Sequence, residues 1–360
     1  MGASNSRETS TTAGGENVRF KYASASMQGF GAEMEDAYAV LPDLDQTTSF
    51  FGLYDGHGGA EVALLCAKLF HVELQVHPNY HENLDIAIRR MFSRMDELLL
   101  QSEEWRTLVK PTGDSRSCIQ HIFCPIVNPW YCTEETPYIP PENTGSSVSV
   151  AVTRGNQIII ANVGDSHCVA SSHGQAIQLS IDHHPSDPDE RQRIERAGGK
   201  IDTDNRVVRE AGRVNAFTMI LGMLATSRAI GDFVFKQNNN LPPEEQMVIC
   251  DPDILSMEIT NDIEFLVIAS RGIWASLSRQ AVVDFVHDEL QFGETDLRLI
   301  CERLVAHAQP TVFDTTVILI QFKHAAADEA VENQERVRAP LSSERQACSQ
   351  RGALRSERLV

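Results

Sequence analysis

Acidic side chains and one histidine stand where strands are expected to end, and their types suit metal-assisted chemistry. The group comprises Glu33, Glu35, Asp36, Asp55, His57, Asp165 and Asp314. Carboxylates that converge from several strands suit hard cations such as Mg²⁺ or Mn²⁺, which prefer oxygen ligands. Each motif alone is a weak signal, because Asp-Gly and Gly-Asp are common turn dipeptides, and His57 could equally be a turn residue. Only the set as a whole indicates a metal site.

Short runs rich in Val, Ile and Phe, punctuated by turn residues, predict the strands that would position these groups. The runs are SFFGLYD, SSVSVAV, QIIIANVGDS, HCVAS, AIQLS, IEFLVIAS and TTVILIQF. We expect them to form a largely antiparallel, multi-stranded arrangement.

Helical spacing separates the clusters of strands. It is found at Met91, Met95, Leu98 and Leu99, and again at Leu297, Ile300, Leu304 and Ala308. A third helix is predicted in SDPDERQRIERAGG, where Asp187 would cap the first turn, Pro188 suits the first position, Glu190 fits a capping box and Gly198 ends the run. Strands in clusters with helices between them, without regular alternation, predict a layered α+β sandwich.

The composition excludes some partners. The chain has 360 residues and a formal net charge of -19, with no Lys/Arg-rich run, so we expect no nucleic-acid partner. The chain contains no run of about 18 consecutive apolar residues, so we predict no membrane-spanning helix. The eight cysteines form no CxxC pair and no apolar signal segment begins the chain, so we expect reduced thiols in a cytoplasmic protein.

We divide the chain into three parts. Residues 1–17 are rich in Ser, Thr and Gly and are expected to form a flexible arm, and residues 323–360 a disordered or weakly helical tail. Residues 18–322 form the predicted domain, with a proline-rich insertion at about 110–143. Zinc binding in the insertion would use Cys118, Cys124, Cys132 and His121, but their spacing matches no compact zinc motif, so we favour ordinary loop thiols.

The first residues, MGASNS, match the pattern for N-myristoylation at Gly2, with Ser6 at the favoured position. A small polar leader that matches by chance is the alternative. One acyl chain binds a membrane only marginally, so a second signal or a partner would be required for peripheral membrane association.

From about residue 23 to 322 the chain resembles the protein phosphatase 2C family of metal-dependent Ser/Thr phosphatases. The segments that carry the resemblance, in the order of the family, are MQGFGAEMEDA, FFGLYDGHGG, NTGSSVSVAV, IIIANVGDSHCV, DHHPSDPDERQRIERAGG, LATSRAIGD, FLVIASRGIWASLSRQAVVDFV and DTTVILI. The resemblance implies a four-layer α-β-β-α sandwich of two antiparallel sheets flanked by helix pairs.

The resemblance also implies a two-metal site in which a bridging hydroxide attacks phosphoserine or phosphothreonine. Asp55 would bridge the Mn²⁺ or Mg²⁺ ions. The Gly56 carbonyl and Glu35 would serve one ion, Asp314 the other, and Asp165 a looser third position. His57 would protonate the leaving alcohol.

Two acidic positions of the family pattern are altered here. Where the family reads D-G-[IV]-[WF]-D, this chain has Arg271 and Ala275. At about 4 Å and an effective dielectric near 20, two unit charges interact by about 4 kcal/mol, so an arginine would repel a divalent ion by about 8 kcal/mol. The two-metal centre is therefore expected not to be intact.

Further departures point the same way. The family usually places an arginine that grips the substrate phosphate where this chain has Gly31, and commonly an asparagine where it has Thr315. His167 replaces a usual arginine at a position that is more structural.

We therefore expect a catalytically inactive member of the family, a regulatory or scaffold protein that binds a kinase, a phosphatase or a phosphoprotein. The retained acids Glu35, Asp55 and Asp314 would hold one ion or pair with Arg271. The alternative is a weak Mn²⁺- or Mg²⁺-dependent Ser/Thr phosphatase, which the intact DGHGG motif favours.

Overall fold

The computed structural model describes residues 10–31, 33–101, 144–209, 223–308 and 312–323. The myristoylation motif at Gly2, the 110–143 insertion and all but the first residue of the predicted tail lie outside the described residues. The chain divides into two units, Met1–Phe322 and Lys323–Val360, and the elements below belong to the first.

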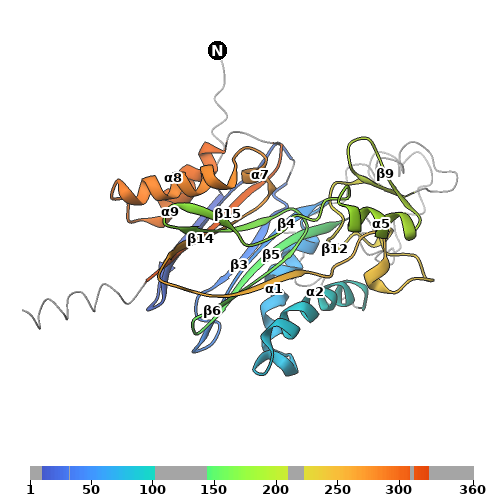
Figure 1. The fold of residues 1–360 in the computed structure, drawn as a ribbon, viewed down its shortest axis with the longest axis horizontal. Helices are drawn as coiled ribbons and strands as arrows, with labels where there is room; N and C mark the ends of the chain where they lie inside the picture. Colours follow the sequence, from blue (N-terminus) through green and yellow to red (C-terminus); the bar gives the residue numbers. More distant parts are fainter. Residues whose placement is uncertain (1–9, 32, 102–143, 210–222, 309–311, 324–360) are drawn as a thin grey trace, which may run out of the picture. The chain divides into compact units, whose positions relative to one another are not determined.

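Two large antiparallel sheets dominate the first unit (Figure 1). The strands of the first sheet are, in spatial order, β1 (Ser10–Glu16), β2 (Phe20–Met27), β15 (Thr315–Phe322), β14 (Ile263–Ala269), β7 (His167–Ser172) and β8 (Gln175–Gln178). Those of the second are β13 (Asp253–Glu258), β6 (Gln157–Val163), β5 (Gly145–Arg154), β4 (Thr48–His57) and β3 (Ala37–Leu41), with β12 (Ile230–Gly231) paired to β5. A small third sheet has the order β11 (Met223–Leu224), β10 (Val207–Arg209), β9 (Gly199–Ile201).

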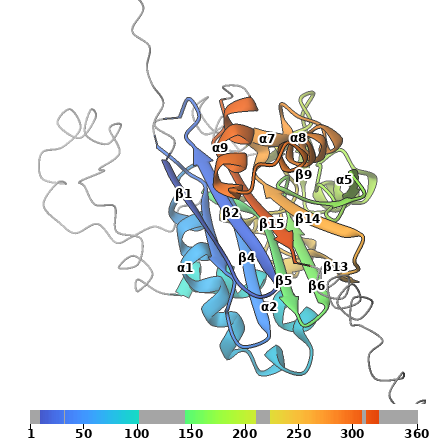
Figure 2. The ribbon, with the colours of Figure 1, turned by 90° about the vertical axis from the view of Figure 1, so that its left-hand side faces the viewer.

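Helices cover the outer face of each large sheet, as both ribbon views show (Figures 1 and 2). The second sheet is covered by α1 (Glu61–Val76) and α2 (Leu84–Gln101), and the first by α8 (Arg279–Gln291) and α9 (Leu297–His307). The shorter helices are α5 (Pro188–Arg196), α7 (Arg271–Trp274) and the 3-10 turns η1 (Pro78–Tyr80), η3 (Phe233–Phe235) and η4 (Pro243–Glu245).

Three apolar layers hold these elements together. One lies between the two sheets and includes Phe51, Leu266 and Ile318, which are almost fully buried. The others lie between each sheet and its helices. Strands that alternate their side chains between two covered faces are buried on both, and β4, β5 and β14 are accordingly buried along most of their length. The predicted antiparallel α+β sandwich with flanking helices is confirmed.

The periodic segments fold as helices. Met91, Met95 and Leu99 face the core from α2, and Leu297, Ile300 and Leu304 face it from α9. No helix among the described residues is long and apolar enough to cross a membrane.

Two local expectations are wrong. Part of the predicted flexible arm, Ser10–Glu16, forms the edge strand β1, because its backbone pairs with β2. Helix α5 begins at Pro188 as predicted, but Asp187 accepts a hydrogen bond from the amide of His184 instead of capping the helix. Glu190 makes no capping box, since its carboxylate turns inward to Arg193 and Arg228.

Candidate active site

A cavity of about 680 Å³ lies where strands of both large sheets end. Its walls come from the ends of β4 and β6, the beginnings of α7 and β15, and the loops before β3 and after β12. The acidic residues that line it are Glu33, Glu35, Asp55, Asp165, Asp232 and Asp314, and the basic residues that line it are His57 and Arg271. Gly31 and Gly56 also line it, so the structure brings the predicted ligands and His57 to one place.

Asp55 lies near the end of β4, and its Oδ2 accepts a hydrogen bond from the backbone amide of Arg271 at 2.8 Å. Burial raises the pKa of the Asp55 carboxyl well above its usual range, and the charges of Asp36 and Asp165 raise it further. At Gly56 the backbone passes so close to the Glu35 carbonyl that a Cβ atom would overlap with it. Only glycine allows this approach, which brings Glu35 next to the end of β4.

Asp314 precedes β15 and holds the loop that carries Glu35. Its Oδ1 accepts a hydrogen bond from the Gly29 amide at 2.7 Å, and its Oδ2 accepts one from the Glu35 amide at 2.6 Å. The pKa of Glu35 is raised, first by burial and then by the neighbouring charge of Asp314. Asp314 therefore positions the loop and adds negative charge to the same cavity.

The charges around Asp55 suit a divalent cation. Asp36 lies next to it, with both carboxylate oxygens buried. Burial raises the pKa of Asp36 to about 7. No three acidic, His or Cys side chains in the described part of the chain form a ready-made ligand group.

Arg271 does not lie among the carboxylates of Glu35, Asp55 and Asp314 as expected. Its guanidinium stacks on the Phe313 ring, 4.3 Å from the ring centroid, and its Nη1 lies 3.5 Å from Asp165 Oδ2. Asp165 also accepts a hydrogen bond from Ser147 Oγ at 3.0 Å. The predicted ion pair of Arg271 with Glu35, Asp55 or Asp314 is therefore wrong, and the acid that pairs with Arg271 is Asp165 in the turn after β6.

The other altered positions have different surroundings. Ala275 is exposed at the end of α7 and lies outside the cavity lining, and Thr315 is buried as the first residue of β15. Gly31 lines the cavity without a side chain. His167 is buried against Trp274, and burial together with Arg279 lowers the pKa of its ring to about 4.

His57 forms an ion pair that sequence reasoning missed. Its Nε2 lies 2.7 Å from Asp232 Oδ2, and 29% of the side chain remains exposed. Burial alone would lower the pKa of His57, but the charge and hydrogen bond of Asp232 outweigh it and raise the pKa to about 9. The imidazole is therefore protonated at neutral pH and can donate a proton.

Asp232 could have been found from one signal in the sequence. It ends the quoted motif LATSRAIGD, a Gly-Asp dipeptide like the one at Asp165. Its backbone has a positive φ of 52°, a conformation that Asp adopts more readily than most residues. A Cβ atom at Gly145 would overlap with both Asp232 and His57, so this glycine makes room for the pair.

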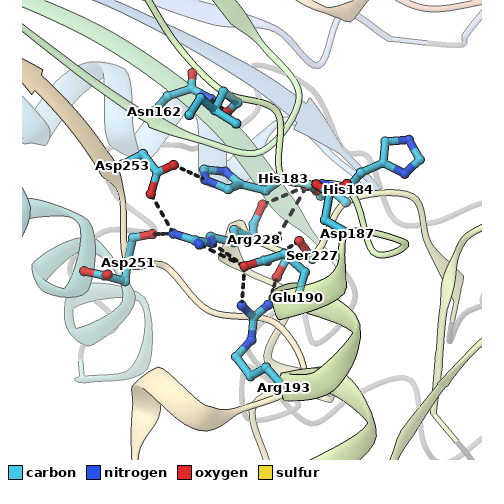
Figure 3. Close-up of polar contacts among 12 residues, drawn as sticks. Asn162, His183, His184, Asp187, Glu190, Arg193, Ser227, Arg228, Asp251 and Asp253 are labelled. Carbon is cyan, nitrogen blue, oxygen red and sulfur yellow. Dashed lines mark hydrogen bonds and ion pairs between the residues drawn. The ribbon is translucent and has the colours of Figure 1, made fainter.

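A buried polar network supports the far wall of the cavity (Figure 3). The amide of Gly164 donates to His183 Nδ1 at 3.0 Å, and the amide of His183 donates to the Gly164 carbonyl at 3.1 Å. These two bonds fix the turn that carries Asp165. Thr226, which lines the cavity, donates from its hydroxyl to the His183 carbonyl at 3.1 Å.

Glu190 anchors the other side of this network. Its carboxylate accepts hydrogen bonds from Arg193 and Arg228, each at 2.8 Å, and from the hydroxyl of Ser227. Arg228 also forms an ion pair with Asp253 at 3.2 Å. The side chain of Glu190 is only 7% exposed, so α5 and the segment before β12 are joined through a buried cluster of charges.

Comparisons with known proteins agree with this geometry. Residues 20–119 and 133–312 match the family model described as "Protein phosphatase 2C". The chain is 50% identical, over 91% of its length and 92% of the relative, to "Probable protein phosphatase 2C 21" of Oryza sativa subsp. japonica. It is 46% identical to "Probable protein phosphatase 2C 20" of the same plant, but spans only 63% of that relative.

The fold is also similar to a solved structure. A serine-threonine phosphatase 2C from Toxoplasma gondii superimposes with a TM-score of 0.64 over 87% of this chain and 99% of that chain. The two sequences are 19% identical, so this likeness shows the fold alone.

These similarities overturn the expectation of a catalytically inactive regulatory or scaffold protein. Relatives at 50% and 46% identity are named as phosphatases, which favours the alternative of an active enzyme. The expected repulsion between Arg271 and a divalent ion requires the guanidinium to occupy the position of that ion. In the structure it turns to Asp165 and Phe313 instead.

Proposed function

Since the chain belongs to the protein phosphatase 2C family, we propose that it is an active, metal-dependent phosphatase that hydrolyses phosphoserine and phosphothreonine in proteins. The observation that carries the proposal is the His57–Asp232 pair, a proton donor that faces a cavity lined with carboxylates. A phosphoprotein is then the partner, as the substrate.

Glu35, Asp55, the Gly56 carbonyl and Asp314 would hold the metal, Mn²⁺ or Mg²⁺. When bound, such ions neutralise phosphate charge and lower the pKa of a coordinated water. Arg271 takes the place of one carboxylate of the family pattern, so we expect a second ion to bind more weakly than the first.

His57 acts on the leaving group. Hydrolysis forms a bond between a water oxygen and phosphorus and breaks the bond from phosphorus to the seryl or threonyl oxygen. An alkoxide is a poor leaving group, so a proton delivered to that oxygen speeds the reaction. Because Nε2 of His57 faces Asp232, Nδ1 is the nitrogen that gives its proton to the leaving oxygen.

Asp232 keeps the imidazole ready for this step. It stabilises the imidazolium before transfer and holds the proton on Nε2 afterwards, which fixes the tautomer. The ring then regains its Nδ1 proton from solvent.

Phosphate release from three phosphopeptides of one sequence tests the proposal. We expect hydrolysis of the phosphoserine and phosphothreonine peptides in Mn²⁺ and its loss in excess chelator. Hydrolysis of the phosphotyrosine peptide should be much slower. No metal-dependent release from any of the peptides would refute the proposal.

A further inference from the structure

The cavity contains much negative charge and little positive charge. Six acidic residues line it, and among the described lining residues the only basic side chains are His57 and Arg271. The phosphate of a phosphoserine is itself a dianion near neutral pH, so its entry requires cationic groups. His57 is occupied by Asp232, which leaves the Arg271 guanidinium as the protein cation available to a phosphate.

The Arg271 guanidinium is held in place but not saturated. Its backbone amide is fixed to Asp55, and its side chain stacks on Phe313 at 4.3 Å. Stacking on a ring leaves the N–H edges of a guanidinium free to point outward. Among the described residues the guanidinium makes one ion pair, with Asp165 at 3.5 Å, and no closer hydrogen bond, and 39% of the side chain is exposed.

The same cavity has a wall without a side chain at Gly31. A Cβ atom placed there would meet only the Glu33 carbonyl, at 3.4 Å, so the position is open toward the cavity. A phosphate bound in the cavity therefore receives no charge from this wall, and Arg271 has no competitor there.

We propose that Arg271 binds the phosphate of the substrate, and of the inorganic phosphate product, with the N–H groups that face the cavity. A guanidinium offers a planar fork that matches two phosphate oxygens, and such charge-assisted pairs are about twice as strong as neutral hydrogen bonds. The loose pair with Asp165 gives way to the phosphate. This inference rests on the proposed phosphatase function, for which it identifies the substrate-binding residue.

Inorganic phosphate is the probe that separates this inference from catalysis. The full chain is loaded with Mg²⁺, and phosphate affinity is measured by calorimetry and, independently, as product inhibition of phosphopeptide hydrolysis. We expect Arg271→Met to weaken both by about ten- to a hundredfold, in line with the loss of hydrogen bonds to a charged group. Arg271→Lys, which keeps the charge without the fork, should fall in between.

Arg279→Met is the matched control. Arg279 has nearly the same exposure, 36%, and also faces an aspartate, Asp182 at 3.6 Å; it contacts His167 Nδ1 at 3.0 Å as well, and it does not line the cavity. We expect the phosphate affinity of this variant to stay within about twofold of the natural chain, because general loss of surface charge has only a small effect.

Relocating the charge gives a second readout. In the Arg271→Met background, Gly31→Arg places a guanidinium on the open wall at position 31, and we expect it to restore part of the phosphate affinity. Restoration requires a folded variant, so it also answers the objection that Arg271→Met acts by damaging the fold.

These experiments distinguish failure of the Arg271 inference from failure of the phosphatase proposal. Phosphate affinity that stays within twofold in Arg271→Met, or becomes tighter, overturns the inference even if the enzyme turns over normally. Arg271-dependent phosphate binding in a chain without turnover supports the inference and rejects the phosphatase proposal.

Discussion

At the residue scale, the chemistry of the cavity is set by pairs of opposite charges. Asp232 raises the pKa of His57 to about 9, against the effect of burial. Arg271 and Asp165 form a looser pair whose nitrogen and oxygen are 3.5 Å apart. In the proposed reaction the tight pair would supply the proton for the leaving group, and the loose pair would leave a cation available for phosphate.

The substitution Asp232→Asn tests the first pair. It removes the charge that favours the imidazolium, so the pKa of His57 falls, by about one to three units for a loss of this kind. Activity needs the protonated form of His57 and therefore declines as pH rises through the pKa of His57. Because this pKa is lower in the variant, its activity should decline at lower pH than that of the natural chain. Asn tolerates the positive φ at this position, and the backbone should be preserved. The pH profile of kcat with a phosphoserine peptide is the measurement.

An aryl phosphate serves as the control substrate. A nitrophenolate leaves without protonation, so Asp232→Asn should slow peptide hydrolysis by about 10²-fold and slow nitrophenyl phosphate hydrolysis much less. Equal loss on both substrates, with an unchanged pH profile, would show that Asp232 does not act through His57.

Sequence reasoning identified the residue types at this scale but not how they pair. Asp55, His57 and Asp165 lie at strand ends whose positions the apolar runs predict. The partner of His57 is 175 positions away in the chain, and the direction of the Arg271 side chain depends on Phe313 and Asp165. Such choices depend on tertiary contacts that no local pattern records.

At the scale of the elements, α5 is joined to the cavity wall by buried charge. The predicted capping box at Glu190 was wrong. Arg193 of the same helix and Arg228 from outside it offer the Glu190 carboxylate stronger partners than a backbone amide. The helix boundary was predictable from Pro188, whereas the inward turn of Glu190 required knowledge of Arg228. The hydrogen bonds of this network hold Thr226 and the turn that carries Asp165 in place at the cavity wall.

We expect Glu190→Ala to lower the free energy of unfolding by about 3–5 kcal/mol, because it removes the carboxylate that pairs with buried Arg193 and leaves Arg228 only its pair with the 43% exposed Asp253. Urea denaturation measures this change. Glu195→Ala, on the exposed side of the same helix, removes only a pair with Arg191 at 3.7 Å and should cost less than about 1 kcal/mol. Equal losses in the two variants would argue against the buried network.

The contribution of the Glu190 carboxylate to the free energy of unfolding depends on pH. Burial alone would raise the pKa of Glu190, but Arg228 and Arg193 lower it to about 2. A depressed pKa means that the stabilisation is fully present above the ordinary value of 4.5 and is lost as pH falls toward 2. The stability difference between the natural chain and Glu190→Ala should therefore shrink over this range of pH.

At the scale of the whole molecule, two sheets of this sandwich bring their ends together and concentrate carboxylates at one site. Burial and neighbouring carboxylates, Asp314 for Asp36 and Asp36 with Asp165 for Asp55, raise the pKa values of both groups, so they destabilise the fold when they are ionised. For Asp36 this cost is absent below the ordinary value of 3.8, grows as pH rises from there to about 7, and is constant at higher pH. The sandwich itself was predictable from the alternation of apolar runs, and the convergence of the strand ends was predictable only through the family resemblance.

A divalent cation that binds in the cavity should therefore stabilise the folded domain against unfolding. At a Mn²⁺ concentration a hundredfold above Kd, linkage gives about 2.7 kcal/mol, which corresponds to about 5 °C in Tm for a domain of this size. The shift should be larger at pH 7.5 than at pH 5.5, because protons relieve the same repulsion. Asp55→Asn should raise the Tm of the metal-free chain and remove most of the Mn²⁺ shift. A Tm in the natural chain that does not respond to Mn²⁺ would contradict the metal site.

The most direct test of the account is kcat/KM for a phosphoserine peptide in Mn²⁺, measured for the natural chain and for Asp55→Asn at equal concentrations of folded protein. We expect measurable turnover by the natural chain and a loss of at least about a hundredfold in the variant, the order expected when a site loses its main source of transition-state stabilisation. Equal rates in the two proteins, or no phosphate release by either, would contradict it.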